Sequence, residues 1–181
     1  DLPISVDTTW AAVAEAAFNA GATVVNDISG FLLDPDLPSL VFERGVGAVV
    51  MHNQRGREHR DVIDDIVAGF DETLSVCESA RIELSNLILD PGFGFGWSLE
   101  QNLELLRRLP ELTRFELPLL IGTSRKSSIG TVLGSDTGER LFGTAATVAQ
   151  AICSGIDVVR VHDAIEMRDV VMMTDSIVRR S

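Results

Sequence analysis

Six short runs of mostly apolar, β-branched residues alternate along this chain with longer segments of helical periodicity. Apolar runs without polar alternation are typical of parallel strands that helices cover on both faces. The sequence therefore predicts an α/β fold of repeated strand–helix units, and no change of composition divides residues 1–181 into more than one domain. We expect the strands at residues 4–7, 23–27, 47–52, 87–90, 119–123 and 158–161.

Helical patterns occupy the segments between these strands. Ser98 and Gln101 have the spacing of a capping box, which predicts a helix that begins there. Gly21, Gly45 and Gly155 each follow a helical pattern, where a residue with left-handed backbone often ends the helix. We expect helices at residues 10–20, 37–44, 63–80, 99–109, 138–154 and 165–178, and one more that starts near residue 129.

The composition excludes several classes of partner. A net charge of −12 argues against nucleic-acid binding, because the chain lacks a basic face that would displace counterions. The chain contains no run of 18 apolar residues and no signal-peptide pattern, so we expect a soluble protein without membrane association. Cys77 and Cys153 lack metal-ligand spacing. We expect both to be buried free thiols, which suits a cytoplasmic location.

Polar side chains stand at the carboxyl end of every expected strand. In a closed β/α barrel these ends meet at one mouth, whereas an open doubly wound sheet gathers only those at a switch point. The series therefore favours a barrel with its site at the mouth. The strand ends carry Asp7-Thr8, Asn26-Asp27, His52-Asn53, Asp90, Thr123 to Lys126, and Arg160 to Asp163.

The turn from Gly122 to Ser128 carries two cations and several hydroxyls between a strand and a helix start. Such a turn predicts an anion site, although a purely structural cap has the same residue types. The absence of an upstream Gly-x-x-x-x-Gly excludes a Walker A loop.

The glycine cluster at residues 92–96 does not fit a dinucleotide fingerprint, because Trp97 stands where the last glycine is required. One interpretation is a turn that lets the backbone pass close to a flat ligand at Asp90, with Phe93 or Phe95 available for stacking. The other is a glycine-rich loop without a ligand.

Seven segments, in order along the chain, resemble dihydropteroate synthase. The resemblance covers essentially the whole sequence and implies a TIM-type (β/α)8 barrel that joins p-aminobenzoate to 7,8-dihydropterin-6-ylmethyl diphosphate, with release of diphosphate, in folate biosynthesis. The segments are ISVDT at 4–8, VND at 25–27, MHN at 51–53, LDPGFGFG at 89–96, GTSRKS at 122–127, ERLFGT at 139–144 and RVHD at 160–163.

The resemblance also implies roles for individual residues. Asp90 and Asn26, with Asp7 beside them, would accept hydrogen bonds from the donors of the pterin edge, and Lys126 would donate to its carbonyl and ring nitrogen. The guanidinium of Arg160 would stack on the ring, as planar cations do. The remaining implied roles are the leaving diphosphate for Arg160 with His162, the carboxylate of p-aminobenzoate for Ser127, and stabilisation of a cationic pterin methylene for Asp7.

The sequence departs from that family in ways that shape our expectations. Its first two strand–helix units have no counterpart here, and with them the Asn that would bind Mg²⁺ near the diphosphate, so we expect weak turnover from this chain alone. Trp10 and Trp97 replace residues that are commonly polar in the family. The resemblance implies a homodimer through the last two helices, for which the candidate contacts are Val148, Ile152, Met167, Val171 and Met172.

Several alternatives stay open at this point. A non-catalytic pterin-binding homologue and a pterin-dependent methyltransferase domain are alternative functions. Asp7 and Thr8 could cap the first helix, His52 could be a core histidine, and Arg125 could form an ion pair at the rim rather than contact a ligand.

Overall fold

The computed structural model describes residues 2–179, so the outermost residues of the single domain predicted over 1–181, Asp1, Arg180 and Ser181, lie outside the described part. Its strands are all parallel and follow one another in sequence order. A four-stranded sheet contains β1 (Ser5–Asp7), β2 (Val24–Asp27), β3 (Gly47–Met51) and β4 (Leu87–Asp90). β5 (Leu120–Ile121) pairs with β6 (Val158–Val159), and a parallel bridge between Leu89 and Leu119 connects the two sheets.

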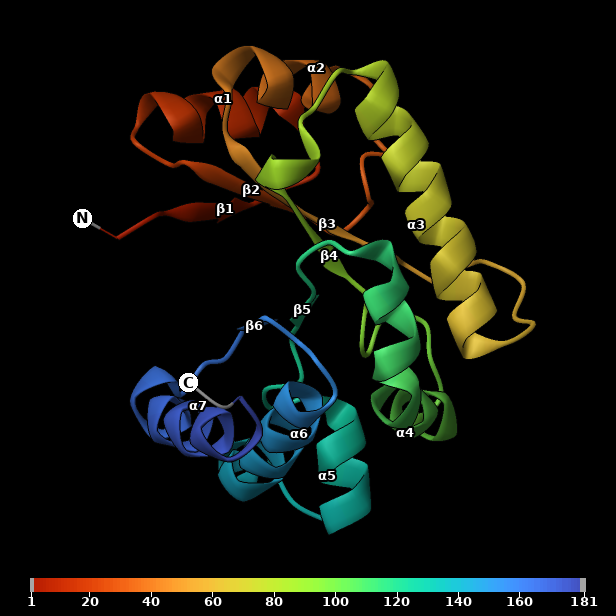
Figure 1. Ribbon diagram of the computed structural model, residues 1–181, viewed down its shortest axis with the longest axis vertical. Helices are drawn as coiled ribbons and strands as arrows, with labels where there is room; N and C mark the ends of the chain where they lie inside the picture. The colour runs from red at the N-terminus through yellow and green to blue at the C-terminus, as the bar shows by residue number, and fades with distance from the viewer. Residues whose placement is uncertain (1, 180–181) are drawn as a thin grey trace.

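The helices lie on the outer side of a curved row of strands, as Figure 1 shows. This arrangement is the one expected of part of a TIM-type barrel, and it confirms the predicted fold class. The α-helices are α1 (Ala11–Asn19), α2 (Asp36–Arg44), α3 (Val62–Ser79), α4 (Leu99–Arg108), α5 (Ser127–Leu133), α6 (Leu141–Cys153) and α7 (Ala164–Val178). Short 3-10 helices occupy Leu84–Asn86, Leu109–Phe115 and Thr137–Glu139.

The start of α6 corrects one prediction. The pattern predicted a helix from residue 138, but Thr137–Glu139 form a 3-10 turn and the α-helix begins at Leu141. Gly138 disfavours an α-helix by about 1 kcal/mol relative to alanine, and the Glu139 amide instead bonds the Asp136 carbonyl at 3.0 Å.

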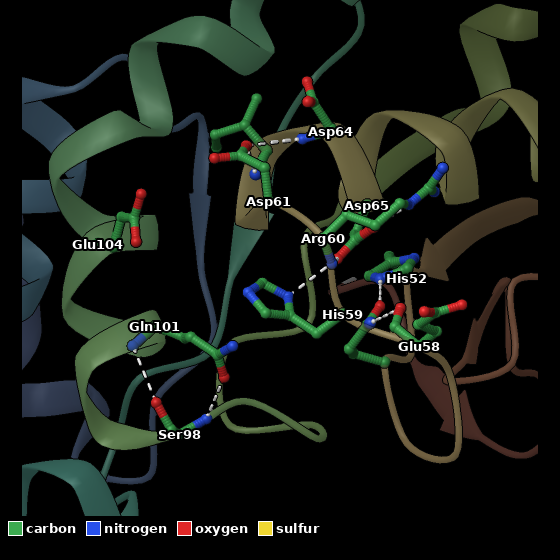
Figure 2. A network of polar contacts seen from close by, with 12 residues as sticks. His52, Glu58, His59, Arg60, Asp61, Asp64, Asp65, Ser98, Gln101 and Glu104 are labelled. Carbon is green, nitrogen blue, oxygen red and sulfur yellow. Dashed lines mark hydrogen bonds and ion pairs between the residues drawn. The ribbon is translucent and has the colours of Figure 1, made fainter.

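The predicted caps are confirmed at α4 and differ at α1. Ser98 and Gln101 form the reciprocal capping box, which Figure 2 shows. Asp7 does not cap α1, because the Ala11 amide donates to Asp34 in the next loop at 2.8 Å. The Thr8 hydroxyl accepts from the Trp10 amide at 3.1 Å, so Thr8 fixes the entry to the helix.

Two clusters of buried apolar side chains hold the structure together. The larger cluster lies between the strands and α1 to α4, and its fully buried members include Val25, Val50, Leu89, Ile66 and Leu105. The smaller cluster lies between α6 and α7 and contains Val148, Ile152 and Met167, with Val171 packed against it.

This smaller cluster corrects the list of candidate dimer contacts. Val148, Ile152 and Met167 are buried within the chain and cannot face a partner. The apolar periodicity of α6 and α7 identified the right face of each helix but could not say whether a strand, a helix or another subunit covers it. Of the five candidates, Met172 is the one that stands well exposed.

The two cysteines have different environments. Cys77 is buried in α3 as predicted, and burial raises the pKa of its thiol to about 12. Cys153 is exposed, so the prediction for it was wrong: it is the last residue of α6 and lies on the outward face.

Among residues 2–179, none of the helices combines the length and the apolarity that crossing a bilayer requires.

Leu89 provides a test of the core. It is fully buried in β4, where it also forms the bridge to Leu119. Leu89→Ala should lower the free energy of unfolding by about 3 kcal/mol, because it removes buried methyl groups and leaves a cavity. Urea denaturation measures the effect. Leu84→Ala, at a side chain that is 53% exposed, is the matched control and should change stability by less than about 0.5 kcal/mol. Equal losses in the two variants would contradict this core assignment.

Candidate active site at the carboxyl ends of the strands

A cavity of about 330 Å³ opens at the carboxyl ends of β1, β5 and β6. Its volume lies within the range of small-molecule sites. The cavity is predominantly polar, as expected for a site that recognises a charged or strongly hydrogen-bonding ligand. Its lining contains Asp7, Gly122, Ser124, Lys126, Arg160, Val161 and His162.

Asp90 is a deeply buried acid near this mouth. It ends β4 with 2% of its surface exposed, and its Oδ1 accepts from the Gly92 amide at 2.8 Å. Burial raises the pKa of its carboxyl to about 6, while the Gly92 amide and the nearby Arg160 and Lys126 cations act in the opposite direction. The two cations therefore stabilise a charge that burial alone would disfavour.

Asn26 stands next to the carboxyl end of β2, and 5% of its surface is exposed. Its side-chain Nδ2 is buried and finds no hydrogen-bond partner among residues 2–179. An unpaired buried donor is costly, so this amide is available for a ligand or a water molecule.

The adjacent Asp27 serves the loop instead of the mouth. Its carboxylate accepts from the Ser29 amide at 2.7 Å, from the Ser29 hydroxyl and from the Phe31 amide at 2.8 Å. Burial raises the pKa of Asp27 from its ordinary value, and these bonds oppose that shift. Asp27 thus fixes the loop that follows Asn26.

Lys126 extends across the glycine-rich loop toward the mouth. Its side chain lies against Gly94, where a Cβ would be 3.0 Å from the lysine Cδ, and its Nζ lies 4.2 Å from the centre of the Phe95 ring. Gly94 also has a left-handed backbone with φ of 81°, so the position favours glycine on both counts. Burial lowers the pKa of Lys126, and Asp90 partly restores it.

Phe95 faces a second cation. The guanidinium of Arg55 lies 4.8 Å from the centre of the same ring. The sequence predicted Phe95 as a stacking surface for a ligand. In the structure its π-face already stabilises two cations, and no sequence signal pointed to the one from Arg55.

The loop between β3 and α3 places Arg55 beside the glycine-rich loop. His52 Nε2 lies 2.9 Å from Gln54 Oε1, and the Gln54 side chain donates to the Glu58 carbonyl. The Gln54 amide donates to the Phe95 carbonyl at 3.2 Å and so joins the two loops. His52 is buried with a lowered pKa, chiefly because of desolvation, in agreement with its interpretation as a core histidine.

Arg160 and Asp7 stand on either side of the mouth. Arg160 follows β6 and lies against Gly122, where a Cβ would be 3.2 Å from its Nε. Its Nη1 lies 3.6 Å from Oδ2 of Asp7, which is mostly exposed at the end of β1. Because both side chains are partly solvated, this ion pair is weak and can exchange for contacts with a ligand.

His162 and Ser127 complete the set of predicted site residues. Both the backbone amide and Nδ1 of His162 lie within hydrogen-bond distance of the Ser124 hydroxyl, at 3.2 and 2.9 Å. Ser124 was not predicted as a functional residue, although its place inside the Ser-Arg-Lys-Ser segment was a signal. Ser127 is exposed at the first turn of α5.

Arg125 takes the rim position that the sequence analysis left open. Its guanidinium pairs with both carboxylate oxygens of Asp163, with Nε donating to Oδ2 at 3.0 Å. The guanidinium lowers the pKa of Asp163 from its ordinary value. The side chain of Arg125 therefore forms an ion pair that joins the β5–α5 turn to the segment after β6.

The family described as "Pterin binding enzyme" matches residues 1–162, and this match assigns the parallel, barrel-type sheet with its polar mouth to a pterin-binding class. Dihydropteroate synthases of Clostridium beijerinckii and Bacillus subtilis are 42% and 38% identical to the chain over 99% of its length. The chain belongs to the dihydropteroate synthase family.

Solved structures give the same result. A dihydropteroate synthase from Clostridium difficile, crystallised in the presence of pteroic acid, has a TM-score of 0.96 and 42% identity, with 99% of this chain and 69% of that one covered. The Coxiella burnetii enzyme in complex with pteroic acid has a TM-score of 0.91, with 32% identity, over 98% and 67% of the two chains. The chain spans 67% and 63% of the Clostridium beijerinckii and Bacillus subtilis relatives, about two thirds of their length.

The raised pKa of Asp90 predicts a pH-dependent difference in stability. The folded pKa of about 6 exceeds the unfolded value, so the folded state holds more protons between about pH 4 and 6, and stability falls as the pH rises through that window. Asp90→Asn removes this titration. Unfolding free energies should be similar for both proteins near pH 4, and wild type should lose on the order of 3 kcal/mol relative to the variant by pH 7. Urea denaturation at several pH values measures the difference, with the exposed Asp71→Asn as control; parallel curves for wild type and Asp90→Asn would contradict it.

Proposed function

We propose that this chain forms the pterin- and diphosphate-binding part of a dihydropteroate synthase. The enzyme would join p-aminobenzoate to 7,8-dihydropterin-6-ylmethyl diphosphate and release diphosphate. The observation that carries the proposal is that Asp90, Lys126 and Arg160, from the ends of three different strands, lie close enough to influence one another electrostatically beside a single polar cavity.

The pterin would bind by its hydrogen-bonding edge. The ring N–H and exocyclic amino groups are donors, for which the Asp90 carboxylate is the matching acceptor, and a charged acceptor gives the stronger bond. The unpaired Asn26 Nδ2 would donate to a ring nitrogen, and the Lys126 ammonium would donate to the pterin carbonyl. The planar Arg160 guanidinium, which lies against Gly122, would stack on the ring.

In the reaction, the bond between the pterin methylene carbon and the diphosphate oxygen breaks, and the diphosphate takes the electron pair. Arg160 and His162 line the cavity and would neutralise the leaving group, while Ser124 holds His162 in orientation. Asp7 would stabilise the methylene cation before the amine of p-aminobenzoate forms the new C–N bond and loses its proton. Ser127 would meet the p-aminobenzoate carboxylate, and Phe95, with Lys126 on its ring, would lie beside the flat ligand at Asp90.

Magnesium enters this proposal through the family resemblance alone. Between residues 2 and 179, no three carboxylate, imidazole or thiol side chains gather closely enough to hold a metal ion. Mg²⁺ is commonly held by one or two carboxylates together with substrate phosphates, so a bound diphosphate would itself supply ligands. No step above passes through the metal.

We also propose a cytoplasmic location, supported by the free thiols of Cys77 and Cys153.

Asp90→Asn tests pterin binding directly. With pteroic acid as the probe, the substitution should weaken binding by about 2 kcal/mol, because it exchanges a charged acceptor for a neutral one opposite ring donors. Isothermal titration calorimetry measures the affinity, with Asp71→Asn on the exposed face of α3 as the matched control. Unchanged affinity in Asp90→Asn would mean that Asp90 only anchors the loop through Gly92.

A parallel assay of diphosphate release separates an enzyme from a protein that binds pterin without turnover.

We also propose a homodimer through α7. Ile165, Met172, Met173 and Ile177 on this helix are between 62% and 75% exposed, more apolar surface than a single helix in water usually presents. Met172→Glu should shift the protein toward monomer at micromolar concentration, because it places a charge in an apolar contact. Light scattering measures the mass, and Leu32→Glu, at an exposed leucine in the β2–α2 loop, serves as the control. A wild-type monomer, or a dimer indifferent to Met172→Glu, would argue against this interface.

A further inference from the structure

The turn that presents Lys126 has a strained backbone at its centre. Arg125 has φ of 56°, a left-handed conformation that residues other than glycine adopt rarely and at a cost. Arg125 is flanked by Ser124, which orients His162, and by Lys126, which lies beside Asp90. The geometry of this one residue therefore sets the direction of two side chains at the mouth, and something outside the turn must hold it.

Both polar backbone groups of Arg125 are held by the start of α6. The Arg125 amide donates to the Thr144 hydroxyl at 3.2 Å, and its carbonyl accepts from Nη1 of Arg140 at 2.9 Å. Arg140 and Thr144 are four residues apart and so lie on the same face of the helix start. Thr144 is fully buried, so water cannot easily replace its hydroxyl.

Arg140 also spans the whole of α5. Its guanidinium lies 3.4 Å from the Lys126 carbonyl before the helix and 3.3 Å from the Ser135 carbonyl after it. It rests directly on Gly130, where a Cβ would overlap the guanidinium. A Cβ at Gly143 would likewise overlap Ile129, so the absence of both side chains lets α5 and α6 approach closely.

We propose that Arg140 and Thr144 are positioning residues that hold the Arg125 turn in its left-handed form and thereby place Lys126 and Ser124 for ligand binding. This inference rests on the proposed function for the identity of the ligand. It gives a role to the segment from Glu139 to Thr144, which the contacts at the mouth leave unexplained. Without the two bonds, Arg125 relaxes toward negative φ and the peptide groups on either side rotate.

The test uses three variants of the whole chain. Thr144→Val keeps the shape but removes the acceptor, and Thr144→Ser restores the acceptor. Gly130→Ala leaves Arg140 and its charge intact but displaces the guanidinium, although alanine is the better helix former. The matched control is Thr174→Val in α7, where a similarly buried hydroxyl bonds, within the described residues 2–179, only the Val170 carbonyl of its own helix.

Two measurements are made on each variant. Hydrogen exchange of the Arg125 amide, followed by NMR, should become at least about tenfold faster in Thr144→Val, the factor expected for loss of the bond that this amide makes. The dissociation constant for pteroic acid should rise by about tenfold or more in Thr144→Val and in Gly130→Ala. Thr144→Ser and Thr174→Val should stay within about threefold of wild type in both measurements, since they keep the bond to Arg125.

The outcomes separate the positioning role from the proposed function. Faster exchange without loss of pteroic acid affinity in Thr144→Val would overturn the positioning role, and so would an equal loss of affinity in Thr174→Val. Unchanged exchange in Thr144→Val would overturn the clamp itself. If wild type fails to bind pteroic acid while the exchange results hold, the clamp stands, and the proposed function and the ligand-placing role both fall.

Discussion

The burial of Asp90 is the constraint on which the rest of the mouth depends. A carboxylate with 2% exposure is stable in its charged form only when donors and cations surround it. The Gly92 amide comes from its own loop, whereas Lys126 and Arg160 come from the segments after β5 and β6. The sequential order of the strands is therefore what brings the compensating charges to this acid, and any shift in their arrangement would leave the charge unpaired.

The mouth is rich in cations, whereas the protein as a whole is acidic. The chain has a net charge of −12, yet Arg55 and Arg160 both lie near Lys126. Such a local concentration of cations within an acidic protein selects for small anions and against extended polyanions, which would meet repulsion beyond the rim. A diphosphate ester of a flat heterocycle meets both conditions, because its charge is compact and its ring is neutral.

Much of this arrangement could be predicted from the sequence, for identifiable reasons. The apolar runs predicted parallel strands in sequence order, and parallel strands bring their carboxyl ends to one edge. The polar residues at those ends, which include Asp7, Asn26, Asp90 and Arg160, therefore predicted a shared polar edge. The exposure of Cys153 could not be predicted, because helical periodicity does not decide whether a helix's last turn is covered. Neither could the position of Arg55 beside Phe95, which depends on how two loops distant in sequence pack together.

The contact between Gly130 and Arg140 has a consequence for how such a sequence can change. A side chain at position 130 and a guanidinium at position 140 compete for the same space, so the two positions are energetically coupled and their substitutions will not be additive. A larger residue at 130 displaces the guanidinium, and a shorter residue at 140 removes its bonds to the carbonyls of Arg125 and Lys126, so either single change disturbs the turn. One steric overlap thus makes both orders of substitution pass through a disturbed intermediate.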